Sequence, residues 1–442
     1  MATYYFYGFI FRKYILEAFM KRVVFLMGII LLAGSALVFA GGNKQSGTAA
    51  AGSGPVTIRF STWDTAVQLA TYQTVIDKFM AANPDIIVQA ESVPENYEQK
   101  LFTAAAAGNA PDVFLWWNYP QLMTGKIIIP LDKYVGTLID QSLYYPQIFE
   151  SSKVNGVLYS VPNAPTTRAM FYNKDLFDAA GVAYPTNDWT WDDFVSIAQK
   201  LTDPSKTQYG FVTESKNSYT VQQFVWTNGG DFVSQDGKTV SGYMNSPATA
   251  EAVQWYADLA LKYKISPTPS SSSTMGGPTE MFKTGKVAMI ESGLWQLNEF
   301  KKIFNVGTCV TPTKNGKRVG VMHSSGLCVY AGTKNVEQAV RFAAEFGGKP
   351  GQTEFARLGY GLAEMPSIAQ ELGTASDPYT KAFYDMIPYC TVKPCFFRTS
   401  DWSLIDEKLA SAIDIVQSGQ ATAQKALDDA VTIINQSVQV GK

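Results

Sequence analysis

The 442-residue chain has one histidine, four cysteines and a formal net charge of only −2, and each of these small numbers excludes a class of function. One histidine and no doubled short cysteine spacing leave too few ligands for a metal site, and no other pattern implies a cofactor. The near-neutral charge leaves no basic surface for a phosphate backbone, so nucleic-acid binding is not expected. The cysteines leave two states open: disulfides between Cys309 and Cys328 and between Cys390 and Cys395, or buried free thiols.

The first forty residues are predicted to be a secretory signal. A basic start at 20–22 precedes the uncharged run 23–40, whose small residues fit a cleavage site after Ala40. The same run is long enough to be read as a membrane span, which is the alternative. Because Met20 has the flank of a signal start, residues 1–19 need not be translated. No cysteine lies near the cleavage point, so we expect a periplasmic protein without a lipid anchor, which begins with a flexible leader over 41–55.

Alternating strand-like and helix-like segments predict a parallel sheet at the start of the mature chain. Residues 56–60 and 86–90 have strand patterns, 69–79 and 96–107 have apolar residues at helical spacing, and 112–116 is a short buried run. Strand–helix–strand order of this kind is typical of a parallel sheet with right-handed crossovers. A mature chain of roughly 400 residues exceeds what one core usually organises, so two lobes are expected.

The carboxyl ends of these strands carry candidate site residues. Ligands of open α/β sheets bind beyond the carboxyl ends of the strands. Three strand ends here supply aromatic or polar side chains, namely Trp63 and Asp64, Glu95, and Trp116 with Asn118. The sequence therefore predicts a binding crevice at this edge.

The rest of the chain is predicted to be richer in helix. Helices are expected over 191–201, 221–227, 247–263, 336–346, 352–358, 402–416 and 421–435, strands over 287–290, 306–310 and 327–330, and a loop over 266–277.

Several strings in this order carry a resemblance to a known family. They are NPDIIVQAESVPENYEQKL, GNAPDVFLW, IPLDKYV, GVLYSVP followed by FYNKDLF, WTWDDFVSIAQKL, FVWTNGGDFVSQDG, MFKTGKVAMIESGLWQL and SSGLCVYAGTKNVEQAVRFAAEF. No single string is decisive, but their conjunction resembles, over nearly all of the mature chain, the sugar-type extracellular solute-binding proteins of ABC importers, whose best-known member binds maltose.

The resemblance implies an α/β, periplasmic-binding-protein-like fold with two α/β lobes, a hinge and a ligand cleft between them. Lobe 1 is expected over 56–164 and 325–373, and lobe 2 over 165–324 and 374–442, with crossings near 164–168, 322–326 and 373–377. The function it implies is capture of a mono- or oligosaccharide by hinge closure and delivery to the membrane subunits of an ABC permease. A monomer without catalytic residues is expected.

A sugar site needs flat aromatic surfaces for the C–H faces of the rings and fixed polar groups for the hydroxyls. The resemblance places stacking rings at Trp295 and Trp402. The full predicted set adds the rings Trp63, Trp116 and Trp226 and the polar groups Asp64, Glu95, Asn118, Arg168, Asn228, Asp231 and Arg398. Related maltodextrin binders carry a charged group where this chain has Asn118, so a smaller or different sugar is equally open.

Two other functions are weighed. A polyamine-binding protein of the same build would use Asp64, Glu95 and Asp231 among the aromatics. An exported glycosidase would need two positioned carboxylates, which 38 acidic residues make unavoidable somewhere and therefore uninformative. The sole histidine, His323, is adjacent to Ser324 and Ser325, which is poor geometry for a catalytic triad, so we interpret it as a hinge residue with its hydrogen bonds satisfied.

Overall fold

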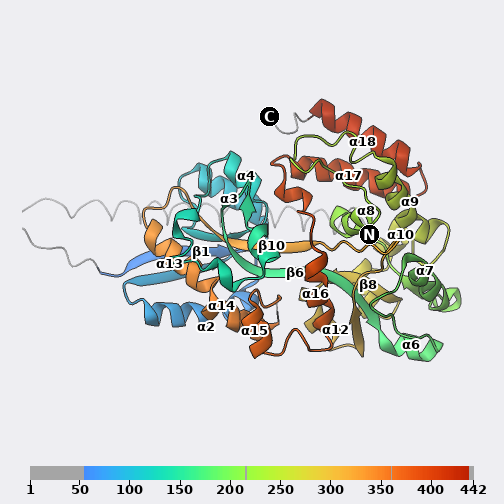
Figure 1. Ribbon diagram of the computed structural model, residues 1–442, viewed down its shortest axis with the longest axis horizontal. Coiled ribbons are helices and arrows are strands. Elements are labelled where there is room, and N and C mark those ends of the chain that lie inside the picture. Colours follow the sequence, from blue (N-terminus) through green and yellow to red (C-terminus); the bar gives the residue numbers. More distant parts are fainter. Residues whose placement is uncertain (1–53, 215–216, 360, 438–442) are drawn as a thin grey trace, which may run out of the picture. The chain divides into compact units, whose positions relative to one another are not determined.

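The computed structural model describes residues 54–214, 217–359 and 361–437, and its centre is an eight-stranded mixed sheet (Figure 1). The strand order is β2-β1-β3-β10-β6-β8-β7, and β9 also pairs with β6. The strands are β1 (Val56–Thr62), β2 (Ile86–Ser92), β3 (Val113–Trp116), β6 (Val161–Asn173), β7 (Tyr209–Phe211), β8 (Val287–Gly293), β9 (Val306–Cys309) and β10 (Met322–Val329); β4 (Lys153–Val154) and β5 (Val157–Leu158) form a separate pair.

Helices cover the sheet. They are α2 (Ala66–Ala82), α3 (Tyr97–Ala106), α4 (Tyr119–Thr124), α5 (Pro146–Ser151), α6 (Lys174–Ala180), α7 (Trp191–Lys200), α8 (Ser218–Thr227), α9 (Pro247–Leu261), α10 (Pro269–Thr274), α11 (Pro278–Lys283), α12 (Leu297–Phe300), α13 (Val336–Phe346), α14 (Lys349–Leu358), α15 (Pro366–Glu371), α16 (Lys381–Met386), α17 (Trp402–Gln417) and α18 (Ala423–Ser437). Short 3-10 turns include η4 (Leu294–Gln296) and η6 (Cys395–Phe397).

The predicted α/β class and the parallel start of the sheet are confirmed. Strand β1 pairs in parallel with β2 and β3. At the other end of the sheet β7 and β8 are also parallel, while β10 is antiparallel to β3 and β6, and β6 to β8. Two parallel ends are therefore joined through an antiparallel middle.

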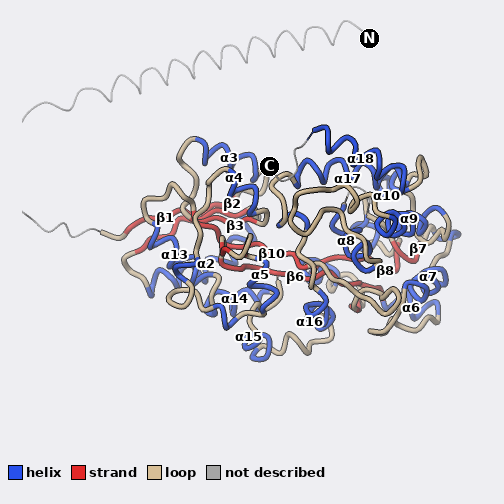
Figure 2. The backbone as a smooth tube through the Cα atoms, turned by 45° about the horizontal axis from the view of Figure 1, so that its top comes forward, coloured by secondary structure: helices blue, strands red, loops and turns tan. Residues whose placement is uncertain are grey.

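The joining strands are β6 and β10. The thirteen-residue β6 pairs with β10 along its first part and with β8 and β9 along its second part. Figure 2 shows β6 and β10 as neighbouring strands between the two ends of the sheet. The pairing register shifts between His323 and Ser325, and Ala164 has a positive φ of 50°. The predicted crossings near 164–168 and 322–326 lie in these two strands, and the lobe boundaries themselves stay a prediction.

Two hydrophobic clusters follow the two faces of the sheet. Alternate residues of β3 and β6 point to opposite faces, as the period of two of a strand requires. Phe114 and Met170 face a cluster built with α3, α7, α8, α9, α17 and α18. Val113 and Phe171 face a cluster built with α2, α13, α14, α15 and α16. The core is thus layered along the whole sheet.

Three local predictions were wrong. Residues 266–277, predicted as a loop, contain helix α10, because the Thr268 hydroxyl caps it by accepting from the Ser271 amide at 3.3 Å. Helix α8 begins at Ser218, three residues before its predicted start, with Asn217 as its cap. Strand β10 begins at Met322, well before residue 327, because its polar first half is held by pairing to β6.

The structure also bears on the cysteines and on the start of the chain. All four cysteines are free and buried, which answers the open question of disulfides in favour of thiols. The predicted signal, residues 1–40, and most of the leader lie outside the described residues. Within the described part of the chain, no helix has the length and apolar character needed to cross a bilayer.

Candidate ligand-binding site

A cavity of about 590 Å³ lies where the first strands, the joining strands and helix α8 meet. Its size is within the range of about 300–1,000 Å³ that is usual for small-molecule sites. The lining combines aromatic and polar side chains, namely Trp63, Asp64, Gln68, Tyr72, Trp117, Ala164, Thr166, Arg168, Asn217, Tyr219, Trp295, His323, Ser324, Ser325 and Phe396.

The turn between β1 and α2 places the first rim residues. Thr65 caps α2 in a capping box with Gln68, so the chain turns sharply after β1 and holds Trp63 and Asp64 at the strand end. The Asp64 carboxylate accepts hydrogen bonds from the Thr62 hydroxyl at 2.5 Å and from the Tyr72 hydroxyl at 2.7 Å. Its position is therefore fixed by its own strand and helix.

A connected group of rings forms one wall. Phe396 lies 5.3 Å from Trp117, 5.4 Å from Tyr219 and 6.2 Å from His323, measured between ring centroids. Most of these pairs have the edge-to-face geometry that aromatic rings prefer. The wall thus draws on the end of β3, helix α8, strand β10 and η6.

Trp295 extends the aromatic wall at the end of β8, where its ring lies 6.2 Å from that of His323 in edge-to-face geometry. Its indole lies against Gly293, where an added Cβ would stand 1.9 Å from the ring, so only glycine admits this close approach. The Arg168 guanidinium is 5.9 Å from the centroid of the Trp295 ring. Trp295 itself is 44% exposed. The indole is therefore available to stack on a ligand.

Arg168 is buried and is paired with protein carboxylates through its Nε and Nη2. Its Nε and Nη2 donate to the two oxygens of Glu291 at 2.6 and 2.7 Å, and Nη2 also donates to Thr220 at 2.8 Å. Glu214 lies 3.7 Å from Nη2. Burial by itself lowers the pKa of Arg168, but the charge and hydrogen bonds of Glu291 outweigh it and raise the pKa above the ordinary value. The bidentate geometry is that of an ionised pair.

His323 is the neutral member of the lining. Burial and the positive charge of Arg168 lower its pKa to about 3. Its Nε2 is buried and has no hydrogen-bond partner among the described residues. A nitrogen of a neutral imidazole can either donate one hydrogen bond to a ligand hydroxyl or accept one from it, depending on the tautomer.

The structure brings four of the twelve predicted residues to the cavity and places eight elsewhere. Those that line it are Trp63, Asp64, Arg168 and Trp295. Those outside the lining are Glu95, Trp116, Asn118, Trp226, Asn228, Asp231, Arg398 and Trp402.

The outlying residues near the cavity face the interior. Trp116 is the last residue of β3 and points into the core, donating to the Asn118 carbonyl at 2.8 Å, so its neighbour, the partly buried Trp117, lines the cavity. Asn118 is itself buried. Trp402 is buried behind Tyr219, to whose hydroxyl its Nε1 donates at 3.2 Å.

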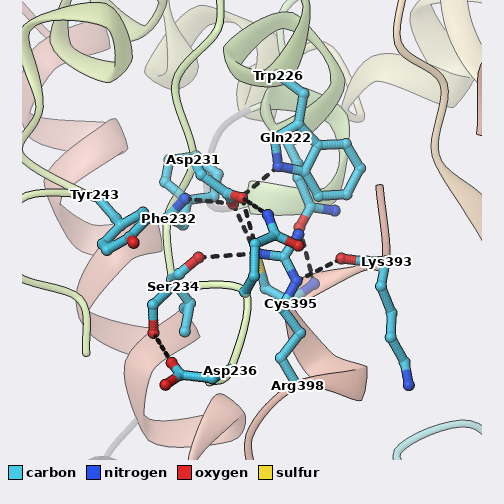
Figure 3. Close-up of polar contacts among 12 residues, drawn as sticks. Gln222, Trp226, Asp231, Phe232, Ser234, Asp236, Tyr243, Lys393, Cys395 and Arg398 are labelled. Carbon is cyan, nitrogen blue, oxygen red and sulfur yellow. Dashed lines mark hydrogen bonds and ion pairs between the residues drawn. The ribbon is translucent and has the colours of Figure 1, made fainter. Parts of the chain in front are cut away.

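The other outlying residues are bonded elsewhere in the fold or exposed. Trp226, Asp231 and Arg398 form a buried polar cluster, in which Asp231 accepts from both of the others (Figure 3). Asn228 donates to the Ala248 carbonyl at 2.7 Å, and Glu95 is exposed.

Sequence reasoning missed much of the wall. The polar start of α8 was a usable signal for Tyr219, because Asn217 is a good capping residue. Phe396 follows Pro394 in an irregular segment that carries no periodicity, and no local pattern marks it.

Two binding proteins are similar in sequence to most of this chain. The maltotriose-binding protein of Pyrococcus abyssi is 25% identical over 338 residues, covering 74% of this chain and 70% of its own length. The sn-glycerol-3-phosphate-binding periplasmic protein UgpB of Escherichia coli is 26% identical over 395 residues, covering 82% and 88%.

Solved structures share the periplasmic-binding-protein-like fold. The ABC substrate-binding protein Lmo0181 of Listeria monocytogenes, in complex with cycloalternan, superimposes with a TM-score of 0.77 at 26% identity, covering 87% of this chain and 99% of its own. A cyclo/maltodextrin-binding protein complexed with maltotetraose shares the fold with a TM-score of 0.72 at 19% identity, covering 89% and 100%. The family model of the bacterial extracellular solute-binding proteins matches residues 62–353, and the chain belongs to that family.

Proposed function

We propose that the protein is the exported substrate-binding component of an ABC-type carbohydrate importer and that its ligand is an uncharged mono- or oligosaccharide. The observation that carries this proposal is a cavity walled by indole and phenyl rings, in which Arg168, the only cation among the described lining residues, is already paired with Glu291. Rings suit the C–H faces of a sugar, and the remaining lining offers neutral donors and acceptors for its hydroxyls.

The charges of the lining argue against an anionic ligand. A sugar phosphate or glycerol phosphate would need a cation free to accept it, and Arg168 is held by two oxygens of Glu291. His323, with its pKa lowered to about 3, supplies no positive charge at neutral pH. The similarity to a glycerol-phosphate-binding protein therefore does not carry its ligand over to this chain.

The same lining argues against a polyamine ligand and against catalysis. Asp64 is the only carboxylate among the described lining residues, and it already accepts from Thr62 and Tyr72. A polyamine needs several free acidic groups, and glycoside hydrolysis needs two placed carboxylates. We infer that the protein binds its sugar without changing it.

Capture by closure fits the place of the cavity. The lining comes from the β1 and β3 ends, from the joining strands β6 and β10, and from α8 and η4 beyond them. A ligand that contacts both groups stabilises the closed arrangement, because only differential contacts shift such an equilibrium. We propose lobe boundaries near residues 164, 324 and 373, a monomeric state, a periplasmic location without a lipid anchor, and delivery to a membrane permease.

A fluorescence titration tests the proposal. The protein has nine tryptophans, and three of them line the cavity. Neutral maltooligosaccharides and other neutral sugars are titrated beside sn-glycerol 3-phosphate and spermidine, and small-angle scattering measures the radius of gyration with and without ligand. We expect saturable binding and a smaller radius with a neutral sugar only. Preferential binding of the phosphate or the amine, or release of shorter sugars from an oligomer, would refute the proposal.

A further inference from the structure

Three predicted site residues, Trp226, Asp231 and Arg398, do not line the cavity, yet they form a densely bonded buried cluster (Figure 3). The side chain of Arg398 is only 1% exposed and that of Asp231 is 11% exposed. A buried ion pair is weak evidence for stability by itself, since desolvation offsets much of its attraction. The contacts of this ion pair with the segment 393–398 relate it to the cavity wall instead.

The cluster fixes the short turn that carries Phe396. Arg398 Nε donates to the Lys393 carbonyl at 2.6 Å, which closes the segment 393–398 into a loop around the phenylalanine. Arg398 Nη1 donates to Asp231 at 2.8 Å and to the Val233 carbonyl at 2.8 Å, which attaches that loop to the segment after α8.

The residue before Phe396 is tied to the same partners. The Cys395 amide donates to Gln222 at 3.3 Å, and the Cys395 thiol lies 3.6 Å from Asp231 Oδ1. Asp231 also accepts from the Trp226 indole at 2.9 Å and from the Phe232 amide at 2.8 Å. Cys395 and Arg398, which lie before and after Phe396, are thus both held by the Asp231 carboxylate.

A close backbone approach locks the other side of the loop. Gly237 has a φ of +73°, and a Cβ at this position would stand 1.9 Å from the Arg398 carbonyl oxygen. The turn of residues 234–237 therefore lies directly on the Arg398 backbone, where no larger residue fits.

Phe396 transmits this anchoring to the cavity. Its ring contacts three lining rings from three elements, Trp117, Tyr219 and His323. A ring with few rotamers, held from behind on both sides, sets the shape of the wall against which a ligand packs. The polar cluster and the cavity wall are therefore connected through the segment 393–398.

We propose that Arg398 and Asp231 are positioning residues, which act through Phe396 and fix the aromatic wall that selects the sugar. This inference rests on the proposed sugar-binding function. It also explains how these two residues serve the site without contacting the ligand.

The test uses Arg398→Lys, Phe396→Leu and the double variant in the full mature chain. Lysine keeps the charge but cannot donate to Asp231 and the Lys393 carbonyl together. We expect each single change to weaken sugar binding about tenfold, which corresponds to about 1.4 kcal/mol. Because both act on one ring, the double variant is expected to lose about ten- to twentyfold and not a hundredfold.

A readout without ligand separates positioning from general stability. The protein is labelled with 5-fluorotryptophan, and the Trp117 fluorine resonance is assigned by its absence in Trp117→Phe. We expect the resonance to move in Arg398→Lys and to stay in place in the matched control Arg341→Lys, whose pair with Asp85 lies on the surface away from the cavity.

Three outcomes overturn the positioning role: unchanged sugar affinity in Arg398→Lys, a hundredfold loss in the double variant, or a Trp117 resonance that does not respond. If the unmodified protein binds no sugar, the proposed function fails instead, and the fluorine resonance still decides whether Arg398 holds the aromatic wall.

Discussion

Replacement of Trp295 by alanine separates ligand contact from folding most clearly. The side chain is 44% exposed. An aromatic side chain buries about 150–250 Å² when it is fully covered, so a sugar face that covers just over half of the free indole removes roughly 50 Å² from water. At about 25 cal/mol per Å² this contributes about 1.3 kcal/mol.

Stacking adds a second contribution. Aromatic contacts of good geometry are worth about 0.5–1.5 kcal/mol beyond their buried area. Together the two effects amount to about 2–3 kcal/mol, so Trp295→Ala is expected to weaken sugar binding by roughly 30- to 150-fold. Isothermal titration calorimetry with the best neutral sugar measures the change.

Stability of the empty protein should hardly change. Exposed side chains contribute little to folding, and a substitution at Trp295 removes only its peripheral contacts with Gly293, Arg168 and His323. Trp402→Ala is the buried counterpart, since its ring is 1% exposed, and should lower the free energy of unfolding by about 3–5 kcal/mol.

The matched control is Tyr243→Ala. Tyr243 is 38% exposed and does not line the cavity, so its loss should alter neither affinity nor melting temperature. Equal losses of affinity and melting temperature in Trp295→Ala would show that the indole is a core residue, and the reasoning from exposure would be refuted.

Three further changes test the electrostatics. Glu291→Gln leaves Arg168 buried without a full countercharge, so urea denaturation should show a loss of about 3–5 kcal/mol; a loss below 1 kcal/mol would contradict the ionised pair. Because the pKa of His323 is lowered to about 3, the unfolded state binds a proton between about pH 6 and 3 and the folded state does not. The free energy of unfolding should therefore decrease as the pH falls through this range, by at most about 1.4 kcal/mol per pH unit. His323→Asn should reduce that slope. Burial raises the pKa of Glu364 well above its ordinary value, so the wild type should lose stability as the pH rises above the ordinary range of a carboxyl group. Urea midpoints of Glu364→Gln should not show this loss.

The sheet could be predicted from the sequence because its signals are local. The strand at Val56–Thr62 and the helix after it follow from period and capping, and the rule on strand ends led to Trp63 and Asp64. Two adjacent tryptophans at the end of β3 are a harder case. Alternation decides that Trp116 faces the core and Trp117 the cavity, but this needs the register of the strand, which the sequence left open.

The rest of the site depends on contacts that are distant in the chain. Phe396 reaches the wall because Arg398 joins a segment 167 positions earlier, at Asp231. No periodicity encodes such a pairing. Trp226 and Trp402 look from the sequence like free rings at helix ends, yet tertiary packing buries both. Tryptophan frequency therefore predicted an aromatic site without indicating which rings line the cavity.

The long strand β6 also has an evolutionary consequence. Thr166 and Arg168, which line the cavity, belong to β6, the strand whose backbone connects the two ends of the sheet. A substitution in β6 that changes the cavity for a new sugar is therefore expected to change the stiffness of this connecting strand as well. Ligand preference should therefore diversify more readily through the turns that hold Trp117, Trp295 and Phe396, where a ring can be exchanged while the connecting backbone stays as it is.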